Sequence, residues 1–330
     1  MDKLKVGLIG IGRIAQDHLA ALAKVEAAEV FALSSRNREA LTKAAERFGA
    51  KALYQDYHEL LANKDVQAVM ICTPNRLHYS MALEALEAGK HVFLEKPMAE
   101  TLREGCNIAI TAAAEGLTVS VCYLSRYMPV FAEAARLIKS GAVGKPLMFT
   151  GRRFWHRDKF PEWWAAEKHL AIPHFGSHSL DLGVWYLGGT GTRVFAEGLS
   201  TKSAFSGESE YSLVARMTTG AILSLDFSMT CRRAQFDHVI ICENATISIP
   251  GVTKILLDEK THFEIDEDDC YKKGFYEEAK EFVAAVLEDR ESLTSAGESL
   301  KSMELVEAAV RSAETGQSVT IAGEPCPKKP

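Results

Sequence analysis

Short aliphatic runs alternate with longer amphipathic segments over the first 123 residues of the chain. The aliphatic runs have the length of buried strands and lie at 4–10, 29–35, 51–54, 66–73, 91–96 and 118–123. The segments between them have helical spacing and lie at 13–25, 37–49, 56–63, 76–90 and 101–116. This alternation predicts an α/β unit built on a doubly wound parallel sheet.

The pattern changes after a predicted helix at 129–140. Extended runs separated by turn residues follow, as in an open, largely antiparallel sheet. Helical patterns return at about 275–289 and 298–315, and the pattern of a last strand covers 317–323. The second part of the chain is therefore predicted to be α+β.

Length and composition agree with two domains. At 330 residues the chain exceeds what one hydrophobic core usually organises. We therefore predict domains at 1–123 and 124–330, with the C-terminal helix and strand able to pack back toward the first domain. The content of 47 % hydrophobic and 25 % charged residues is typical of globular proteins and argues against disorder.

Charge and hydropathy argue against two classes of partner. The net charge of −6 is spread along the sequence without a basic cluster, so nucleic acid is not an expected partner. No apolar run reaches the roughly 18 to 20 residues of a membrane span. The N-terminal MDKLKVGLIGIG also lacks the pattern of a signal peptide. We expect no membrane partner and a cytoplasmic location.

A glycine motif follows the first predicted strand and opens a helix. The stretch GLIGIGRIAQDH at 7–18 has Gly10, Gly12 and Ala15 in the GxGxxA spacing of dinucleotide-binding Rossmann domains. Gly10 permits a tight turn, Gly12 lets a pyrophosphate approach the backbone, and Ala15 allows the helix to pack closely on the strand. Phosphate is then expected at the positive end of the helix, beside its first residues Arg13 and Ile14.

The end of the second predicted strand bears on which dinucleotide is bound. An acidic residue there accepts hydrogen bonds from the ribose 2′-hydroxyl and repels a 2′-phosphate. Here the segment is LSSRN, in which Ser35 and Arg36 offer a hydroxyl and a guanidinium instead. The segment favours NADP(H). An Arg36 stacked on adenine would accept either cofactor, so NAD(H) stays possible.

Two histidines stand four residues apart in the stretch IPHFGSHSLDLGVW at 172–185. On a helix, His174 and His178 would share one face and could reach one ion or one substrate. A zinc site would need a third ligand, for which the nearby candidates are Asp181, His169 and His156. No two of the seven cysteines have CxxC spacing. We predict no bound metal.

Further motifs resemble a known family. The stretch CTPNRLHYSMALEALEAGKHVFLEKPMA at 72–99 resembles the TPNxxH and EKP elements of the glucose-fructose oxidoreductase / inositol dehydrogenase (Gfo/Idh/MocA) family. The stretches at 123–146 and 299–321 are similar to that family's crossover segment and its C-terminal helix and strand. The resemblance implies hydride transfer between NAD(P) and a secondary alcohol or ketone of a sugar, glycoside or polyol. It also implies a homodimer or homotetramer formed through the C-terminal sheet.

The resemblance assigns residues to the cofactor. Lys96 would lie near the nicotinamide, Glu95 would fix the turn before Pro97, which would be cis, and His78 would fix the loop at 73–75. Together with the motifs above, the residues expected at the cofactor are Gly10, Gly12, Arg13, Ile14, Ser35, Arg36, Thr73, Pro74, Asn75, His78, Glu95 and Lys96.

The resemblance also assigns catalytic residues. HFGSHSLD at 174–181 is similar to the family's DxGxHxxD element, which puts His178 at the catalytic histidine. Because a histidine suits proton transfer near neutral pH, we expect His178 to carry the proton and Lys96 to orient the reacting oxygen, although the roles could be exchanged. His174 stands where the family usually has aspartate, so a carboxylate-assisted mechanism is in doubt.

Aromatic and cationic side chains cluster where the substrate is expected. Sugars bind to flat apolar surfaces combined with hydrogen-bond donors, and the density of Arg and His suits an acidic or phosphorylated sugar. The residues expected at the substrate are His174, Arg126, Arg153, Trp155 and Trp163. Some of the tryptophans could equally be core residues.

Two other functions remain open at this point. One is a glycosidase that keeps NAD tightly bound and cleaves its substrate through transient oxidation at C3 and elimination. The other is a regulator that senses cofactor or sugar without catalysis, although the presence of Lys96 and His178 argues against it.

Overall fold

A computed structural model describes residues 3–156, 169, 171–201, 207–323 and 326. The chain forms two compact units: the first consists of Met1–Tyr127 and Tyr271–Leu300, and the second of Met128–Cys270 and Lys301–Pro330. Residues 271–300, which the hydrophobic pattern assigns to the second domain, therefore belong to the first unit. The first cut lies after residue 127 rather than 123.

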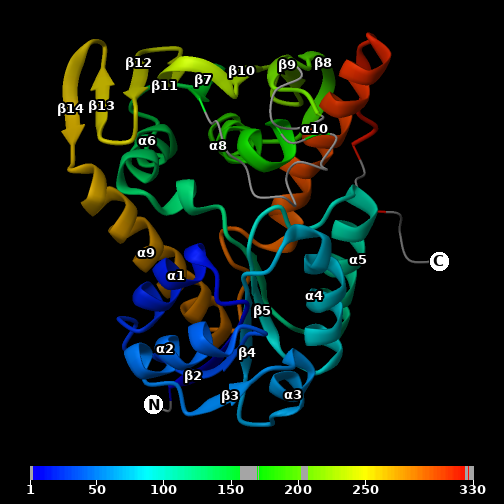
Figure 1. Ribbon diagram of the computed structural model, residues 1–330. Coiled ribbons are helices and arrows are strands. Elements are labelled where there is room, and N and C mark those ends of the chain that lie inside the picture. Colours follow the sequence, from blue (N-terminus) through cyan, green and yellow to red (C-terminus); the bar gives the residue numbers. More distant parts are fainter. Residues whose placement is uncertain (1–2, 157–168, 170, 202–206, 324–325, 327–330) are drawn as a thin grey trace. The chain divides into compact units, whose positions relative to one another are not determined.

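The first unit contains a six-stranded parallel sheet (Figure 1). Its strands are β1 (Leu4–Ile9), β2 (Ala28–Ser34), β3 (Ala52–Tyr54), β4 (Ala68–Ile71), β5 (His91–Leu94) and β6 (Val119–Val121). The strand order is β3-β2-β1-β4-β5-β6, the order of doubly wound dinucleotide-binding folds. The direction of winding reverses between β1 and β4, and ligands bind such sheets at this switch point.

Helices flank this sheet, and local signals set their ends. They are α1 (Arg13–Leu22), α2 (Arg38–Phe48), α3 (Tyr57–Ala62), α4 (His78–Glu87), α5 (Leu102–Glu115) and α9 (Glu267–Leu287), with the 3₁₀ turns η1 (Asn75–Leu77) and η2 (Leu124–Tyr127). The side chain of Asn37 caps α2, and Thr101 with Glu104 forms a capping box on α5. Gly49 ends α2 in the left-handed conformation.

Helix α9 completes the core of the first unit although it lies far along the chain. The buried Ala279, Phe282 and Val283 of α9 join side chains of α1, α2 and the sheet in one apolar cluster. The ring of Phe282 stacks on Phe93 of β5 with 4.9 Å between centroids. Figure 1 shows α9 beside α1. The apolar face of α9 therefore explains why residues 271–300 belong to this unit.

The second unit is built on a nine-stranded mixed sheet. Its strands are β7 (Pro146–His156), β8 (Gly191–Leu199), β9 (Glu210–Met217), β10 (Ile222–Ser228), β11 (Thr230–Cys242), β12 (Thr246–Pro250), β13 (Lys254–Leu257), β14 (Lys260–Glu264) and β15 (Val319–Thr320). Their order is β14-β13-β12-β11-β7-β10-β9-β8-β15. Only the β7–β10 pair among these described strands is parallel, which confirms the predicted open and largely antiparallel sheet.

Three helices pack on one face of this sheet: α6 (Pro129–Lys139), α8 (Ser177–Leu187) and the part of α10 (Ala296–Thr315) that follows residue 300 (Figure 1). Strand β9 shows the resulting alternation, because Leu213 and Ala215 are buried whereas Ser212 and Val214 are exposed. The other face of the sheet has no helix over it among the described elements. In the described part of the chain, no helix is both long and apolar enough to span a bilayer.

Candidate functional site

The turn between β1 and α1 has the geometry of an anion-binding turn. Gly10 has a φ of 93°, and a Cβ there would lie 2.7 Å from the backbone oxygen of Cys72, so only glycine fits. Gly12 is the N-cap of α1, and nothing lies within 4 Å of where its Cβ would be. No side chain caps the helix, and its first turn has no acidic residue. The first N–H groups of α1 therefore suit a phosphate.

The residues after β2 keep the cationic character seen in the sequence. Ser35 accepts a hydrogen bond from the backbone N–H of Asn37 at 3.2 Å, and Arg36 is exposed. At the start of α1, Arg13 is also exposed and forms an ion pair with Asp17 at 3.9 Å, whereas Ile14 packs against the core. These residues leave an exposed guanidinium at the end of β2 and no carboxylate.

His78 ties together the loops that follow β4 and β5. Its Nδ1 lies 2.7 Å from the carbonyl oxygen of Pro97, and its Nε2 lies 2.9 Å from that of Thr73. The ring is fully buried, and this burial lowers the pKa of His78 against the opposing effect of the two carbonyls. Asn75, in η1, is buried in the same loop. The expected nicotinamide loop and the EKP turn are thus held by one side chain.

Glu95 fixes the backbone of Lys96. One carboxylate oxygen, Oε2, accepts the N–H of Lys96 at 3.0 Å, and the other, Oε1, lies 2.8 Å from Nε2 of His18. Burial acts to raise the pKa of Glu95, but the hydrogen bond from His18 and the charges of His18, Lys96 and His78 outweigh it and lower the pKa. Glu95 is therefore an anion at neutral pH. The peptide bond between Lys96 and Pro97 is cis, as predicted.

In the second unit, the two histidines of interest lie on different helical segments. Residues Ala171–Gly176 form a π-helix that contains the buried His174 and continues into α8. His178, in the first turn of α8, is half-buried, and Asp181 is fully buried. His174 and His178 therefore do not share one regular α-helix, because the π-turn changes the register between them. Such π-turns occur frequently at functional sites.

Strand β7 supports this π-turn through two of the predicted substrate residues. The guanidinium of Arg153 donates to the carbonyl oxygen of Phe175 at 3.2 Å, and it lies 5.0 Å from the ring centroid of Phe236. The Trp155 ring packs edge-on against Phe175 with 4.4 Å between centroids. Arg153 and Trp155 thus come together beside the turn that carries His174.

Sequence reasoning missed His238, which supports α8. Its Nε2 lies 3.1 Å from the hydroxyl of Ser179, the residue after His178, and its ring stacks on Phe149. Burial, and then the charge of Arg153, lowers the pKa of His238 to about 3. The ring is therefore neutral, and it supports α8 through its contact with Ser179 and its stacking on Phe149. A histidine at an inward position of FDHVIIC was the only signal in the sequence.

Two other predicted substrate residues stand apart. Arg126 lies in η2 of the first unit, is only 2 % exposed, and donates to the carbonyl oxygen of Leu293 at 3.1 Å. That contact ties η2 to the loop before α10, which is a structural role. Trp163 lies outside the described residues.

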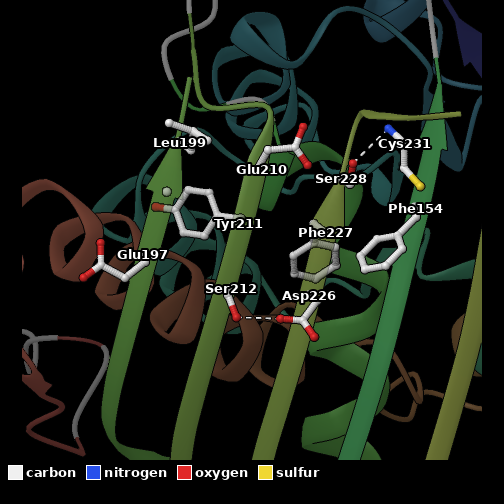
Figure 2. A pocket seen from close by; sticks show the side chains of 11 residues that line it. Phe154, Glu197, Leu199, Glu210, Tyr211, Ser212, Asp226, Phe227, Ser228 and Cys231 are labelled. Atoms are coloured by element: carbon white, nitrogen blue, oxygen red, sulfur yellow. Dashed lines mark hydrogen bonds between the residues drawn. The ribbon is translucent and has the colours of Figure 1, made fainter. Parts of the chain in front are cut away.

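A hollow of about 560 Å³ lies on the sheet of the second unit. Figure 2 shows the side chains of Glu197, Glu210 and Asp226 around it, with the Ser212 hydroxyl donating to Asp226 at 2.5 Å. None of the predicted site residues lines this hollow. Its carboxylates give it an acidic lining, which does not suit the phosphates of a dinucleotide.

The anion-binding turn at the switch point and the clamped loops after β4 and β5 define a dinucleotide-binding protein with a second α+β domain. Comparisons with known proteins identify the family. Residues 4–123 match the profile described as "Oxidoreductase family, NAD-binding Rossmann fold", and residues 131–248 match the "GFO/IDH/MocA C-terminal domain". The chain belongs to the Gfo/Idh/MocA family of oxidoreductases.

Several proteins are similar to this chain. Inositol 2-dehydrogenase from Salmonella typhimurium is 35 % identical over 188 residues, which cover 56 % of this chain and 54 % of that protein. The chain thus spans about half the length of this relative. Inositol 2-dehydrogenase/D-chiro-inositol 3-dehydrogenase from Shouchella clausii is 30 % identical over 353 residues, 99 % of this chain and 96 % of that protein.

One solved structure with a similar fold is the WlbA dehydrogenase from Bordetella pertussis in complex with NADH and UDP-GlcNAcA. It superposes with a TM-score of 0.83 at 25 % identity and covers 97 % of this chain and 98 % of that one.

Proposed function

We propose that the protein is an NAD(P)-dependent dehydrogenase that acts on a CH–OH group of a sugar, glycoside or polyol. The observation that carries the proposal is the Glu95–Lys96–Pro97 turn, which His78 and Glu95 hold at the edge of the dinucleotide-binding sheet. The same edge carries the anion-binding turn at Gly10 and Gly12. The names of the two inositol dehydrogenases that the chain resembles support a polyol or sugar substrate.

In this proposal, two side chains share the proton chemistry. The bound nicotinamide supplies the hydride acceptor or donor. His178 carries the proton of the reacting hydroxyl, because an imidazole titrates near neutral pH. Lys96 places a positive charge at the developing alkoxide and so stabilises it. The backbone of Lys96 is fixed, which restricts where its ammonium group can reach and so helps to hold that group in one position.

For the cofactor, we propose a preference for NADP(H). Ser35 and the exposed Arg36 offer a hydroxyl and a guanidinium where a carboxylate would select the unphosphorylated ribose. The family description names NAD, so NAD(H) remains the cofactor to compare with.

For the substrate, we propose that His174 replaces the anionic contact of relatives that have aspartate at this position. The Arg153–Phe175 contact ties the cation-bearing strand β7 to the π-turn of His174. His174 beside Arg153 offers a hydrogen-bond donor in place of a carboxylate, which favours a substrate with a carboxylate or phosphate group. An acidic or phosphorylated sugar is therefore preferred over a neutral polyol.

The decisive experiment is a screen of sugars, sugar acids, polyols and glycosides with NAD and NADP, followed by the absorbance of the reduced cofactor. We expect net formation of reduced cofactor, with higher kcat/KM for NADP. In the Lys96→Ala variant, turnover should fall by at least about a hundredfold, on the scale of losing one preorganised electrostatic contact. The exposed Lys64 provides the matched control, because Lys64→Ala should behave as wild type.

Each other outcome identifies a different function. Glycoside cleavage without net change in the cofactor, with NAD that co-purifies, would indicate the transient-oxidation glycosidase. Cofactor binding without turnover of any compound would indicate a regulator. An active Lys96→Ala variant would remove Lys96 from the mechanism.

A further inference from the structure

Three ionisable side chains meet in the core of the first unit, away from the turns described above. They are His18 of α1, Cys122 after β6 and Glu278 of α9, each only 1 % exposed. A ring nitrogen of His18, Sγ of Cys122 and a carboxylate oxygen of Glu278 all lie within 4.8 Å of one another. Buried ionisable groups are unfavourable unless they are paired, so this cluster calls for an explanation.

Two groups of this cluster, one on His18 and one on Glu278, lack hydrogen-bond partners. Nε2 of His18 contacts Glu95, but Nδ1 has no hydrogen-bond partner among the described residues. Neither carboxylate oxygen of Glu278 has one either. Buried polar atoms are nearly always satisfied in folded proteins. The two groups do not contact each other directly, and one water between the Glu278 carboxyl group and Nδ1 of His18 would satisfy both.

The protonation states that the surroundings favour agree with this pairing. Glu95 is an anion and only accepts hydrogen bonds, so Nε2 of His18 carries the proton of that contact. Burial, and then the negative charge of Glu95, raises the pKa of Glu278 well above its ordinary value. Glu278 is therefore a neutral acid with one proton to donate.

The His18 ring has little freedom to turn away. Phe93 and Phe275 meet it edge-on, with 5.7 Å and 5.0 Å between ring centroids. Phe275 and Glu278 lie three positions apart on α9, so one helix supplies both a packing contact and the carboxyl group. The orientation of His18 is therefore set from α9, and His18 in turn contacts the carboxylate that holds Lys96.

We propose that Glu278 and His18 are positioning residues that act on Lys96 through Glu95. Glu278 is linked to Nδ1 of His18 through one water, His18 donates to Glu95, and Glu95 accepts the backbone N–H of Lys96. Neither Glu278 nor His18 contacts substrate in this scheme. The proposal rests on the proposed function, in which Lys96 stabilises the reacting oxygen. In this scheme, α9 supplies Glu278 and so links the C-terminal part of the chain to the position of Lys96.

The test compares variants of Glu278 in the full-length protein. Glu278→Gln keeps the size and an N–H donor, whereas Glu278→Met keeps the size without a donor. We expect kcat within about twofold of wild type for Glu278→Gln and a fall of at least tenfold for Glu278→Met. Measured NADP affinity should change by less than about twofold in both variants, because the glycine turn is untouched. The assay uses the substrate with the highest turnover in the screen above.

A second pair of variants tests the same chain at His18. The amide of His18→Gln offers Glu95 a donor, and His18→Leu does not, so kcat should fall more in His18→Leu. Imidazole NMR provides a readout that does not depend on turnover. Nε2 of His18 should carry a proton, and the Nδ1 signal of His18 should shift in Glu278→Met, because that variant removes the group linked to Nδ1.

Several results would overturn the proposal. Wild-type kcat in Glu278→Met and His18→Leu would show that the chain does not position Lys96. Equal losses of stability, cofactor affinity and kcat in the Gln and Met variants would show a role in folding only. Stoichiometric zinc in the purified protein, lost in Glu278→Met, would make the cluster a metal site instead. If NMR shows the expected His18 state but Lys96→Ala is fully active, the proposed function fails while the hydrogen-bonded chain stands.

Discussion

At the scale of single residues, buried histidines position the loops and helices of both units. His78 joins the loops after β4 and β5, His18 contacts the carboxylate that fixes Lys96, and His238 supports α8 beside His178. Each is at most 1 % exposed. A histidine suits this role, because its flat ring has two nitrogens that can contact separate groups and packs against aromatic rings. For His78 and His238, burial lowers the pKa, which makes the fold sensitive to acid.

His238 makes a measurable prediction about acid. In the unfolded chain its pKa is near 6.5, whereas in the folded protein it is about 3. Below pH 6.5 the unfolded state therefore gains a proton that the folded state does not take up, so stability falls as the pH falls. The contribution is up to about 1.4 kcal/mol per pH unit between these values. Urea denaturation at pH 7 and pH 5 measures it.

The control for this prediction is His238→Gln, which keeps an N–H near Ser179 and does not titrate. Its free energy of unfolding should depend less on pH between 7 and 5 than that of wild type. An unchanged slope in His238→Gln would show that the ring is not held neutral.

Sequence reasoning predicts site residues whose signals are local and cannot predict contacts whose partners are distant. Gly10, Lys96 and His178 each stand in a short motif. His18 and Glu95 lie 77 residues apart, and His238 and Ser179 lie 59 apart. Such pairs form only when separate strands and helices pack together, and no spacing in the sequence encodes them. For the same reason, the packing role of Arg126 became visible only in the structure.

At the scale of elements, α8 lies so close to its sheet that one glycine is required. A Cβ on Gly183 would lie 2.4 Å from Leu223 Cδ1 and 2.9 Å from Phe149 Cδ1. We expect Gly183→Ala to destabilise the protein by about 1–3 kcal/mol, because helix and sheet must separate to admit the methyl group. Because α8 carries His178, kcat should fall as well. Chemical denaturation and the dehydrogenase assay measure the two effects.

The matched control is a second helical glycine with free space around it. At Gly297 of α10, the nearest atom to a new Cβ is 3.9 Å away. Gly297→Ala should leave stability unchanged or raise it by up to about 1 kcal/mol, because alanine favours the helix. Equal behaviour of the two variants would contradict the close packing inferred for α8.

Whole elements are also easier to predict when local residues set their ends. Helix α2 was predicted within one residue at each end, because Asn37 and Gly49 cap it locally. Helix α9 begins at Glu267, eight residues before the predicted start. Its first turn is acidic, which favours a helix N-terminus, but that turn has no apolar periodicity that would predict a helix. The π-turn at Ala171–Gly176 has no sequence signal of its own, so the sequence does not predict it.

At the scale of the whole molecule, the sheet of the second unit presents one face without helices over it. Strand pairing brings exposed apolar side chains together on that face. Phe195 of β8 lies opposite Val214 of β9, and the same row continues through Ser224, Thr150 and Val239. The mixture of apolar and polar side chains on this face is the composition of many protein interfaces.

We therefore expect the protein to be a homodimer or homotetramer that pairs through this open face. A two-fold interface through this face would bury Val214, which is 49 % exposed, in both copies, and such interfaces usually bury about 1,200–2,000 Å². Val214→Asp would then bury two uncompensated charges and shift the protein toward the monomer, as light scattering after gel filtration measures. Leu53 of β3 is 44 % exposed in the first unit, so Leu53→Asp is the matched control and should keep the wild-type mass. A wild-type assembly in Val214→Asp, or a monomeric wild type, would exclude this face as the interface.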